Sequence, residues 1–222
     1  MEDHPAGLGA APDEMGKLVL ASLLWSPNEK SERFSLAYDE SWAIKLFNGF
    51  RRHVTVPHRC VLYTDRRRVL PAHIEQIVQP DLGCNGYGDC VRPYEMNEPM
   101  ILVGLDTLIV RNIDKLARWC LENPGKLALP KHPYRDISIN GVQLWGGGNP
   151  AIFADWRGEN DMDWMRSFPH KRIDELWPDR VVSWKARVAV RGPGPAQIIY
   201  FHGKQKFDRL AENNAYVRHH WR

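Results

Sequence analysis

Short apolar runs alternate with polar segments in the first half of the chain. The runs Lys17–Trp25, Arg59–Thr64 and His73–Val78 are rich in aliphatic and aromatic residues, a pattern typical of buried strands. Between the first two, the apolar side chains of Tyr38–Phe50 recur every three or four positions, which predicts a helix. A strand, a helix and a further strand in this order predict the opening of a doubly wound α/β sheet.

The second half of the chain continues the alternation with shorter elements. Asp81–Glu95 has the composition of a loop, and its glycines lack the order of a dinucleotide-binding fingerprint. The further helices are expected at Ile113–Leu121, Pro150–Trp156, Asp161–Phe168 and Arg172–Trp177. The further strands are expected at Met100–Val103, Leu108–Val110, Lys126–Leu129, Ser138–Trp145, Val181–Lys185 and Gln197–Phe201.

Asp106 interrupts the apolar stretch at the centre of the chain. It lies between Met100–Val103 and Leu108–Val110, which predicts two buried strands joined at a polar step. Open α/β sheets bind their ligands at such strand ends, although a turn residue produces the same pattern. His202 and Lys204 also follow a predicted strand, and carboxylate, imidazole and ammonium groups suit a metal ion or a phosphate. From pattern alone, a structural role for Asp106 and His202 stays open.

Composition is that of an ordinary globular chain. Its 222 residues are 43% hydrophobic and 26% charged, which suits one domain with a sizeable core. No apolar run approaches the roughly 20 residues of a membrane span. We expect a disordered leader at residues 1–16, a domain at 17–207 and a basic tail at 208–222. The four cysteines form no CxxC pair, so we expect reduced thiols in a cytoplasmic protein; a Cys84–Cys90 pair or zinc site is the alternative.

Basic residues are clustered, although the net charge is only +3. Solvated loops ordinarily explain such clusters, and a polyanionic partner becomes plausible where several share one face. The nine tryptophans are compatible with base stacking, and equally with a globular core. The clusters are Arg51–His53, Arg66–Arg68, Lys131–Arg135, His170–Arg172 and Tyr216–Arg222.

Several segments, in their order along the chain, match the motifs of one enzyme family. They are Cys60–Asp65, a strand ending in Thr-Asp; Leu102–Asp114, similar to the segment around an Asp-x-Asp metal motif; Ser138–Val142, similar to an Asn-Ser-Gly-Val strand; Val181–Lys185, similar to a Ser-Tyr-Lys segment; and Ile199–Lys204, similar to a closing Phe-His-Gly-Lys-Pro. Together they span roughly Leu18 to Lys206 and resemble small glycosyltransferases of the GT-A fold, of phage and bacterial type. The resemblance implies a GT-A-like, Rossmann-related mixed sheet flanked by helices in a single domain.

The resemblance also implies roles for individual residues. Asp106 matches the second aspartate of the metal motif, and His202 matches the histidine that completes metal or diphosphate binding. Asp161 falls where the family often has an acid facing the acceptor sugar or the reacting carbon, and Asp161 or Asp163 would act as general base if the reaction inverts. Donor-binding positions implied in the same way are Ser22, Trp25, Tyr38, Thr64, Asp65, Asp106, Lys185, Gly203 and Lys204.

The chain departs from the family pattern at three places. Gly104 replaces the first aspartate of the metal motif, Met162 replaces a glutamine, and Gln205–Phe207 replaces a proline-rich ending. Two explanations stay open. Either Asp106 and His202 hold Mn²⁺ or Mg²⁺ together with phosphate and water, or the protein is metal-independent or inactive.

The expected function is transfer of a sugar from a nucleotide-diphosphate sugar to an acceptor hydroxyl. The acceptor is a glycan, a protein or a hydroxymethylated phage DNA base, and the reaction inverts or retains configuration. The alternative is a module that binds a nucleotide or glycan without turnover, which Gly104 favours. A nucleotidyltransferase is disfavoured because Trp25–Asn28 stands where a glycine-rich loop is needed. The sequence leaves the oligomeric state open.

Overall fold

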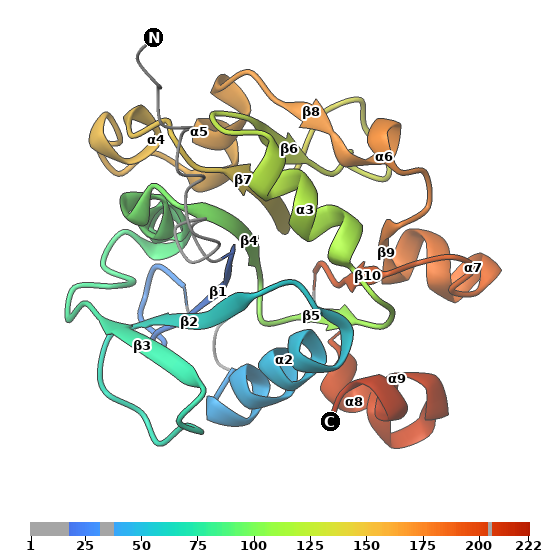
Figure 1. The fold of residues 1–222 in the computed structure, drawn as a ribbon. Helices are drawn as coiled ribbons and strands as arrows, with labels where there is room; N and C mark the ends of the chain where they lie inside the picture. The colour runs from blue at the N-terminus through green and yellow to red at the C-terminus, as the bar shows by residue number, and fades with distance from the viewer. Residues whose placement is uncertain (1–17, 32–37, 204–205) are drawn as a thin grey trace, which may run out of the picture.

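A mixed sheet of seven strands forms the centre of the molecule, in the order β3-β2-β1-β4-β7-β6-β8 (Figure 1). The computed structural model describes residues 18–31, 38–203 and 206–222. β1 pairs in parallel with β2 and β4, whereas β7 runs antiparallel to β4 and β6. The strands are β1 (Leu18–Leu24), β2 (His58–Thr64), β3 (Ile74–Val78), β4 (Pro99–Val103), β6 (Leu127–Leu129), β7 (Val142–Gly146) and β8 (Lys171–Arg172).

A smaller sheet joins the centre of the chain to its C-terminal part. Its three strands lie in the order β5-β10-β9, namely β5 (Thr107–Ile109), β10 (Ile198–Tyr200) and β9 (Val181–Ser183). The register pairs Thr107 with Tyr200, and the Phe201 amide donates to the Asp106 carbonyl at 3.0 Å. This antiparallel pairing brings the Asp106 step beside the segment that contains His202.

Helices cover both faces of the main sheet. Successive side chains of each strand point to opposite faces, so each face carries apolar side chains that the helices bury. Leu18 and Leu20 of β1 face one core, and Val19 and Ala21 face the other. The first core includes residues of α2 (Glu40–His53) and α3 (Asp114–Glu122), and the second includes residues of η2 (Gly86–Met96), a 3-10 helix, α4 (Ala151–Ala154) and α5 (Asp161–Ser167). The expected α/β class, with a mixed sheet flanked by helices in one domain, is confirmed.

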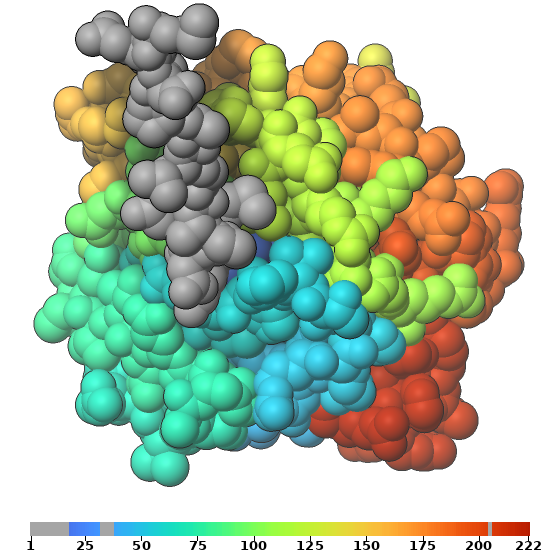
Figure 2. All heavy atoms as spheres, viewed as in Figure 1, coloured from blue at the N-terminus to red at the C-terminus, as the bar shows by residue number. Residues whose placement is uncertain are grey.

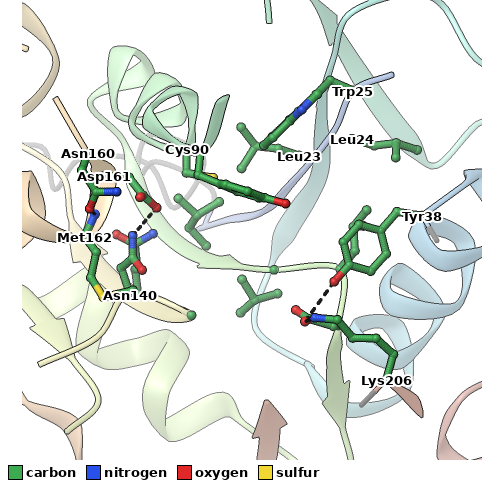
Figure 3. Close-up of a pocket in the computed structure, with 18 of the residues that line it drawn as sticks. Leu23, Leu24, Trp25, Tyr38, Cys90, Asn140, Asn160, Asp161, Met162 and Lys206 are labelled. Atoms are coloured by element: carbon green, nitrogen blue, oxygen red, sulfur yellow. Dashed lines mark hydrogen bonds and ion pairs between the residues drawn. The ribbon is translucent and has the colours of Figure 1, made fainter. Parts of the chain in front are cut away.

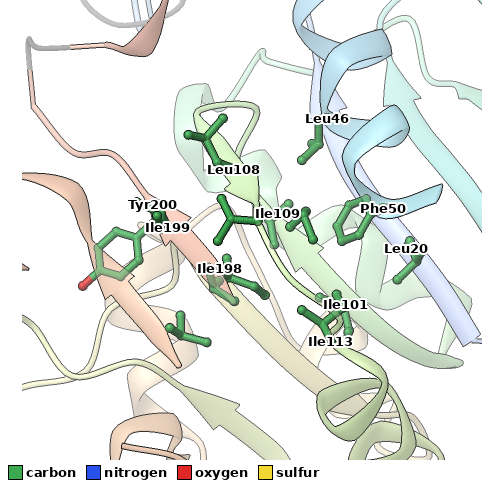
Figure 4. Close-up of a cluster of buried hydrophobic side chains, with 14 of the residues drawn as sticks. Leu20, Leu46, Phe50, Ile101, Leu108, Ile109, Ile113, Ile198, Ile199 and Tyr200 are labelled. Carbon is green, nitrogen blue, oxygen red and sulfur yellow. The ribbon is translucent and has the colours of Figure 1, made fainter. Parts of the chain in front are cut away.

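α2 follows the sequence pattern closely. Asp39 caps its first turn by accepting from the Ser41 amide at 2.9 Å, and basic residues complete its last turn. Gly49 of α2 faces the small sheet, and a Cβ at this position would make an ordinary van der Waals contact with Cβ of Ile109 at 3.4 Å. Leu46 and Phe50 of α2 point toward the small sheet, in the core that joins the two sheets (Figure 4).

The C-terminal segment is part of the first core. The sequence pattern predicts no element over 208–222, yet α8 (Phe207–Asn213) and α9 (Ala215–His220) lie there. Phe207 and Val217 are fully buried, and the rings of Trp42 and Trp221 have centroids 5.1 Å apart. Figure 2 shows these helices forming one continuous surface with α2. Phe207, Leu210 and Ala211 have helical spacing, as do Val217 and Trp221, but polar and charged residues dominate the segment and give it the composition of a tail.

Two other segments differ from the prediction. Asp81–Glu95 is more ordered than its loop composition indicates, because the buried Asp89 carboxylate accepts from the Asn85 amide at 3.2 Å and from Arg92 Nε at 3.0 Å. The strand expected at Val181–Lys185 ends at Ser183, where a π-helical turn, η3 (Trp184–Val188), begins. The two remaining short helices are α6 (Ile173–Leu176) and α7 (Ala189–Arg191). No helix within the described residues is long and apolar enough to cross a bilayer.

Candidate functional site

A cavity of about 390 Å³ opens where β1 and β4 end. In the main sheet, β2 and β3 lie on one side of β1, and β4 lies on its other side. The direction in which successive strands are added to the sheet therefore reverses at β1. Open α/β sheets form their ligand crevice at such a switch point, outside the carboxyl ends of the strands. The volume falls within the range of small-molecule sites. The strand ends Leu23–Trp25 and Leu102–Asp106 form part of its wall.

Asp106 lies at one end of the cavity in a closed set of polar contacts. Its Oδ2 accepts from the Tyr38 hydroxyl at 3.0 Å and forms an ion pair with Lys206 Nζ. The Lys206 ammonium also lies 5.5 Å from the centroid of the Tyr38 ring. Burial raises the pKa of Tyr38, and the neighbouring Asp106 charge raises it further, so the phenol remains a donor. Tyr38, Asp106 and Lys206 therefore act as one unit.

Gly104 makes room for the Asp106 carboxylate. A Cβ at position 104 would lie 2.9 Å from Asp106 Oδ1, closer than side-chain carbon atoms approach such an oxygen. The Gly104 amide donates to the Gly141 carbonyl at 3.2 Å, which fixes the backbone at the step. A side chain at this position would therefore require a shift of the Asp106 carboxylate, whose other oxygen, Oδ2, contacts Tyr38 and Lys206.

Asp161 lies on the opposite side of the cavity (Figure 3). It is the first residue of α5 and only 8% exposed, and Asn140 Nδ2 donates to its Oδ2 at 2.5 Å. Burial raises the pKa of Asp161 to about 6, and the hydrogen bond from Asn140 offsets only part of that effect. The thiol of Cys90 has a raised pKa through burial and the nearby Asp161 charge, so it stays protonated. Asp161 is therefore ionised at neutral pH and still a usable proton acceptor.

Aromatic side chains form a third part of the wall. The rings of Trp25 and Tyr87 meet edge to face with centroids 5.8 Å apart, and Trp25 Nε1 donates to Ser31 Oγ at 3.0 Å. Gly83 packs against the indole of Trp25, which any Cβ at that position would overlap. The indole is thereby fixed as a flat apolar surface beside the end of β1.

The cavity brings together part of the set predicted from the sequence. Ser22 does not line it: the side chain is fully buried and donates to the Val103 carbonyl at 2.8 Å. The predicted residues that do line the cavity are Trp25, Tyr38, Asp106, Asp161 and Gly203.

Thr64 and Asp65 position a neighbouring turn and are not part of the cavity wall. Arg68 Nε donates to Thr64 Oγ1 at 2.7 Å, and another Arg68 nitrogen donates to Asp65 Oδ1 at 2.7 Å. Asp65 Oδ2 also accepts from the Ser26 amide at 3.0 Å. Asp65 therefore fixes the turn that begins directly after Trp25, beyond the end of β1.

His202, Lys185 and Asp163 do not line the cavity. His202 Nε2 is hydrogen-bonded to Ser183 Oγ at 2.8 Å, and burial, followed by the charge of Lys185, lowers the pKa of His202. Lys185 is exposed, and Asp163 is exposed and forms an ion pair with Arg166 of the same helix. Lys204 and the expected leader lie outside the described residues.

These residues do not fit a divalent ion held by the protein. Mg²⁺ and Mn²⁺ require several oxygen ligands, with carboxylates among them. Gly104 offers no carboxylate, Asp106 is already paired with an ammonium, and His202 Nε2 is bonded to Ser183. Within residues 18–31, 38–203 and 206–222, no three His, Cys, Asp or Glu side chains are arranged to hold a metal.

Several wall residues were not predicted as site residues. Asn140 lies within the matched segment Ser138–Val142, so its motif was the available signal. Tyr87 and Cys90 lie in the segment interpreted as a loop, and Lys206 lies in the segment that departs from the family ending. No protein-family model and no curated protein matches the chain. Function is therefore inferred from the geometry of the cavity and from the sequence resemblance.

Proposed function

We propose that the chain is a GT-A-like glycosyltransferase that moves a sugar from a nucleotide-diphosphate sugar to an acceptor hydroxyl. One observation carries the proposal. A single cavity at the β1–β4 switch point has the Asp106–Lys206 pair on one side and the buried Asp161 on the other. A donor sugar needs a cation near its diphosphate and a base near the attacking hydroxyl, and this cavity offers both.

The wall residues divide naturally among the parts of the donor. The indole of Trp25, 6% exposed, contributes an apolar surface of the cavity wall against which a nucleoside base packs. Lys206 offers charge-assisted hydrogen bonds to phosphate oxygens. The sugar then occupies the space between Asp106 and Asp161, within reach of an acceptor at the Asp161 side. The resemblance implies a metal ion, but the residues present do not fit one, so no step is assigned to it.

In the proposed reaction, the acceptor oxygen forms a bond to the anomeric carbon of the sugar. The bond from that carbon to the diphosphate oxygen breaks, and its electron pair leaves with the nucleoside diphosphate. Asp161 takes the proton of the attacking hydroxyl. A carboxylate with a pKa of about 6 is ionised at pH 7 and more basic than an ordinary aspartate. This sequence inverts the configuration of the sugar; a retaining enzyme would use Asp161 to orient the acceptor.

The acceptor in this proposal is a hydroxyl group of a glycan, a protein or a hydroxymethylated DNA base. A base within duplex DNA would have to be flipped out of the helix to reach the Asp161 side of the cavity. Salt-sensitive binding to duplex DNA, measured beside a neutral oligosaccharide, separates these acceptors, because phosphate contacts weaken as salt rises.

A thermal-shift panel of nucleotide sugars, in Mn²⁺ and in EDTA, tests the donor. We expect one nucleotide to raise the melting temperature, and the same sugar nucleotide to be consumed on incubation. Two variants test the metal ligands predicted from the sequence. Asp106→Ala is expected to lose the rise in melting temperature that the nucleotide causes. His202→Ala is expected to retain it, because His202 does not line the cavity. Full donor consumption by Asp106→Ala would remove Asp106 from the site.

A non-catalytic nucleotide- or glycan-binding module is the second candidate, favoured by the glycine at position 104. It requires the same stabilisation by a nucleotide but no consumption of donor under any acceptor condition. Calorimetry combined with chromatography of the incubated donor separates the two functions.

A further inference from the structure

The negative charge of Asp106 is already balanced inside the protein. Lys206 Nζ pairs with Asp106 Oδ2, and the two side chains are 13% and 17% exposed. Both residues line the cavity in which we propose that the donor binds. An ion pair in this degree of burial is held strongly, because separating the partners would leave a poorly solvated charge.

A divalent ion would have to compete with this ammonium for one carboxylate. Only Asp106 offers a carboxylate at this step, because residue 104 is glycine, and its Oδ2 already accepts from Tyr38 and Lys206. A hard divalent cation loses its hydration shell at great cost and needs several anionic oxygens in return. The local contacts thus favour the built-in ammonium over a metal ion.

We propose, on the basis of the glycosyltransferase function above, that Lys206 is the cation that binds the donor diphosphate and that a divalent ion is not required. The N–H donors of Lys206 that do not face Asp106 are available to phosphate oxygens. When the sugar leaves, the electron pair of the broken bond stays on the diphosphate oxygen, and the ammonium stabilises that added charge. Tyr38 holds the Asp106 carboxylate toward Lys206, so the ammonium is positioned before the donor arrives.

Isothermal titration calorimetry with UDP, GDP and inorganic pyrophosphate tests the proposal on the full chain, in EDTA and in Mn²⁺. Wild-type affinity for the best probe is expected to agree within about twofold between the two conditions. Lys206→Met is expected to weaken it by about tenfold or more, since a charge-assisted hydrogen bond is lost, while Lys206→Arg retains most of it. The matched control is Lys115→Met, an exposed lysine of α3 outside the cavity wall.

A charge swap provides a gain-of-function arm. Gly104→Asp combined with Lys206→Met supplies a second carboxylate and removes the ammonium, so binding of the same probe is expected to become Mn²⁺-dependent. This variant also changes the space beside Asp106 Oδ1, and a melting curve verifies that it folds. The comparison of wild type in EDTA and in Mn²⁺ does not depend on any variant folding.

The outcomes separate this inference from the function on which it rests. Wild-type binding that requires Mn²⁺, or unchanged binding by a folded Lys206→Met, overturns the role of Lys206 while the transferase function stands. Metal-independent binding without any donor consumption supports Lys206 and removes the transferase. Absence of binding by every probe in both conditions overturns both.

Discussion

Asp114 and Asp161 are both buried aspartates at the first residue of a helix, and their surroundings differ. Asp114, 7% exposed, accepts from the Thr55 amide at 2.7 Å, the Thr55 hydroxyl at 2.5 Å and the Asn112 amide group at 3.0 Å. Asp161, 8% exposed, accepts from one other side chain, Asn140. The two residues have similar exposed fractions, but the Asp161 carboxyl lies deeper in the protein and accepts fewer hydrogen bonds, so the pKa shifts are opposite.

The difference appears in the pKa values. Burial opposes the charge of Asp114, but hydrogen bonds from Thr55 and Asn112 outweigh it and lower the pKa to about 2. At Asp161 burial outweighs the hydrogen bond, and the pKa is about 6. Asp114 thus stabilises the fold by joining α3 to the segment before β2, whereas Asp161 is held ionised at a cost in stability. A costly charge in a cavity is typical of a functional group.

The largest expected effect of a substitution at these carboxylates is on the rate of sugar transfer. Asp161→Asn removes the proposed base and is expected to lower the transfer rate by about 100-fold or more. Asp163→Asn, two residues along the same helix but exposed, is expected to leave the rate nearly unchanged. Release of nucleoside diphosphate by the two variants measures the difference, and equal losses would contradict the assignment of Asp161.

The next effect is on stability at the structural carboxylate. Asp114→Ala leaves the Thr55 amide without its acceptor, so the free energy of unfolding is expected to fall by about 2–4 kcal/mol. The rate per folded molecule is expected to match wild type, because Asp114 does not line the cavity. Urea denaturation followed by tryptophan fluorescence measures the change. A loss of activity without a loss of stability would show that Asp114 is functional.

Asp161→Asn is expected to change stability in the opposite direction. The folded state binds the Asp161 proton more tightly than the unfolded chain, so wild-type stability decreases as pH rises from 3.8 through about 6. Asparagine does not titrate, and the variant is expected to be more stable than wild type by the order of 1–3 kcal/mol at pH 8. Urea titrations at pH 8 and pH 4 measure the difference in free energy of unfolding between the variant and wild type. The extra stability of the variant is expected to be smaller at pH 4. A destabilised variant at pH 8 would mean that Asp161 is structural.

The smallest expected effect is the pH dependence of turnover. kcat/KM is expected to fall by about tenfold for each pH unit below the Asp161 pKa of about 6, because the protonated acid accepts no proton. Asp114 contributes no limb in this range, since its contribution to stability is lost only as pH falls from 3.8 toward about 2. A pH–rate profile above pH 4.5 isolates Asp161, and a flat profile down to pH 5 would contradict its role as base.

The sequence predicts the sheet well where its periods are clear. The runs that become β1, β2 and β4 have a strand pattern, and the spacing within Tyr38–Phe50 predicts α2. The C-terminal helices are absent from the prediction because polar and charged residues dominate 208–222, although Phe207, Leu210 and Ala211 have helical spacing. Phe207 and Trp221 are held against Trp42 of α2, a contact that the sequence does not reveal.

The site is predictable only in part, because its contacts join residues far apart in the chain. Asp106 stands out as a polar step between apolar runs, but its pairing with Lys206 is invisible in the sequence. Asp114 resembles the end of a motif, whereas its contact with Thr55 identifies a structural role that joins α3 to the segment before β2. Burial separates Asp161 from Asp163, which the sequence treats alike.

A crystal structure with the nucleoside diphosphate selected by the thermal-shift panel would show whether the donor binds at the β1–β4 switch point. We expect the base against Trp25, the diphosphate beside Lys206, and the open end of the cavity facing Asp161. A nucleotide bound away from the β1–β4 switch point, or one whose diphosphate lies out of reach of Lys206, would contradict it.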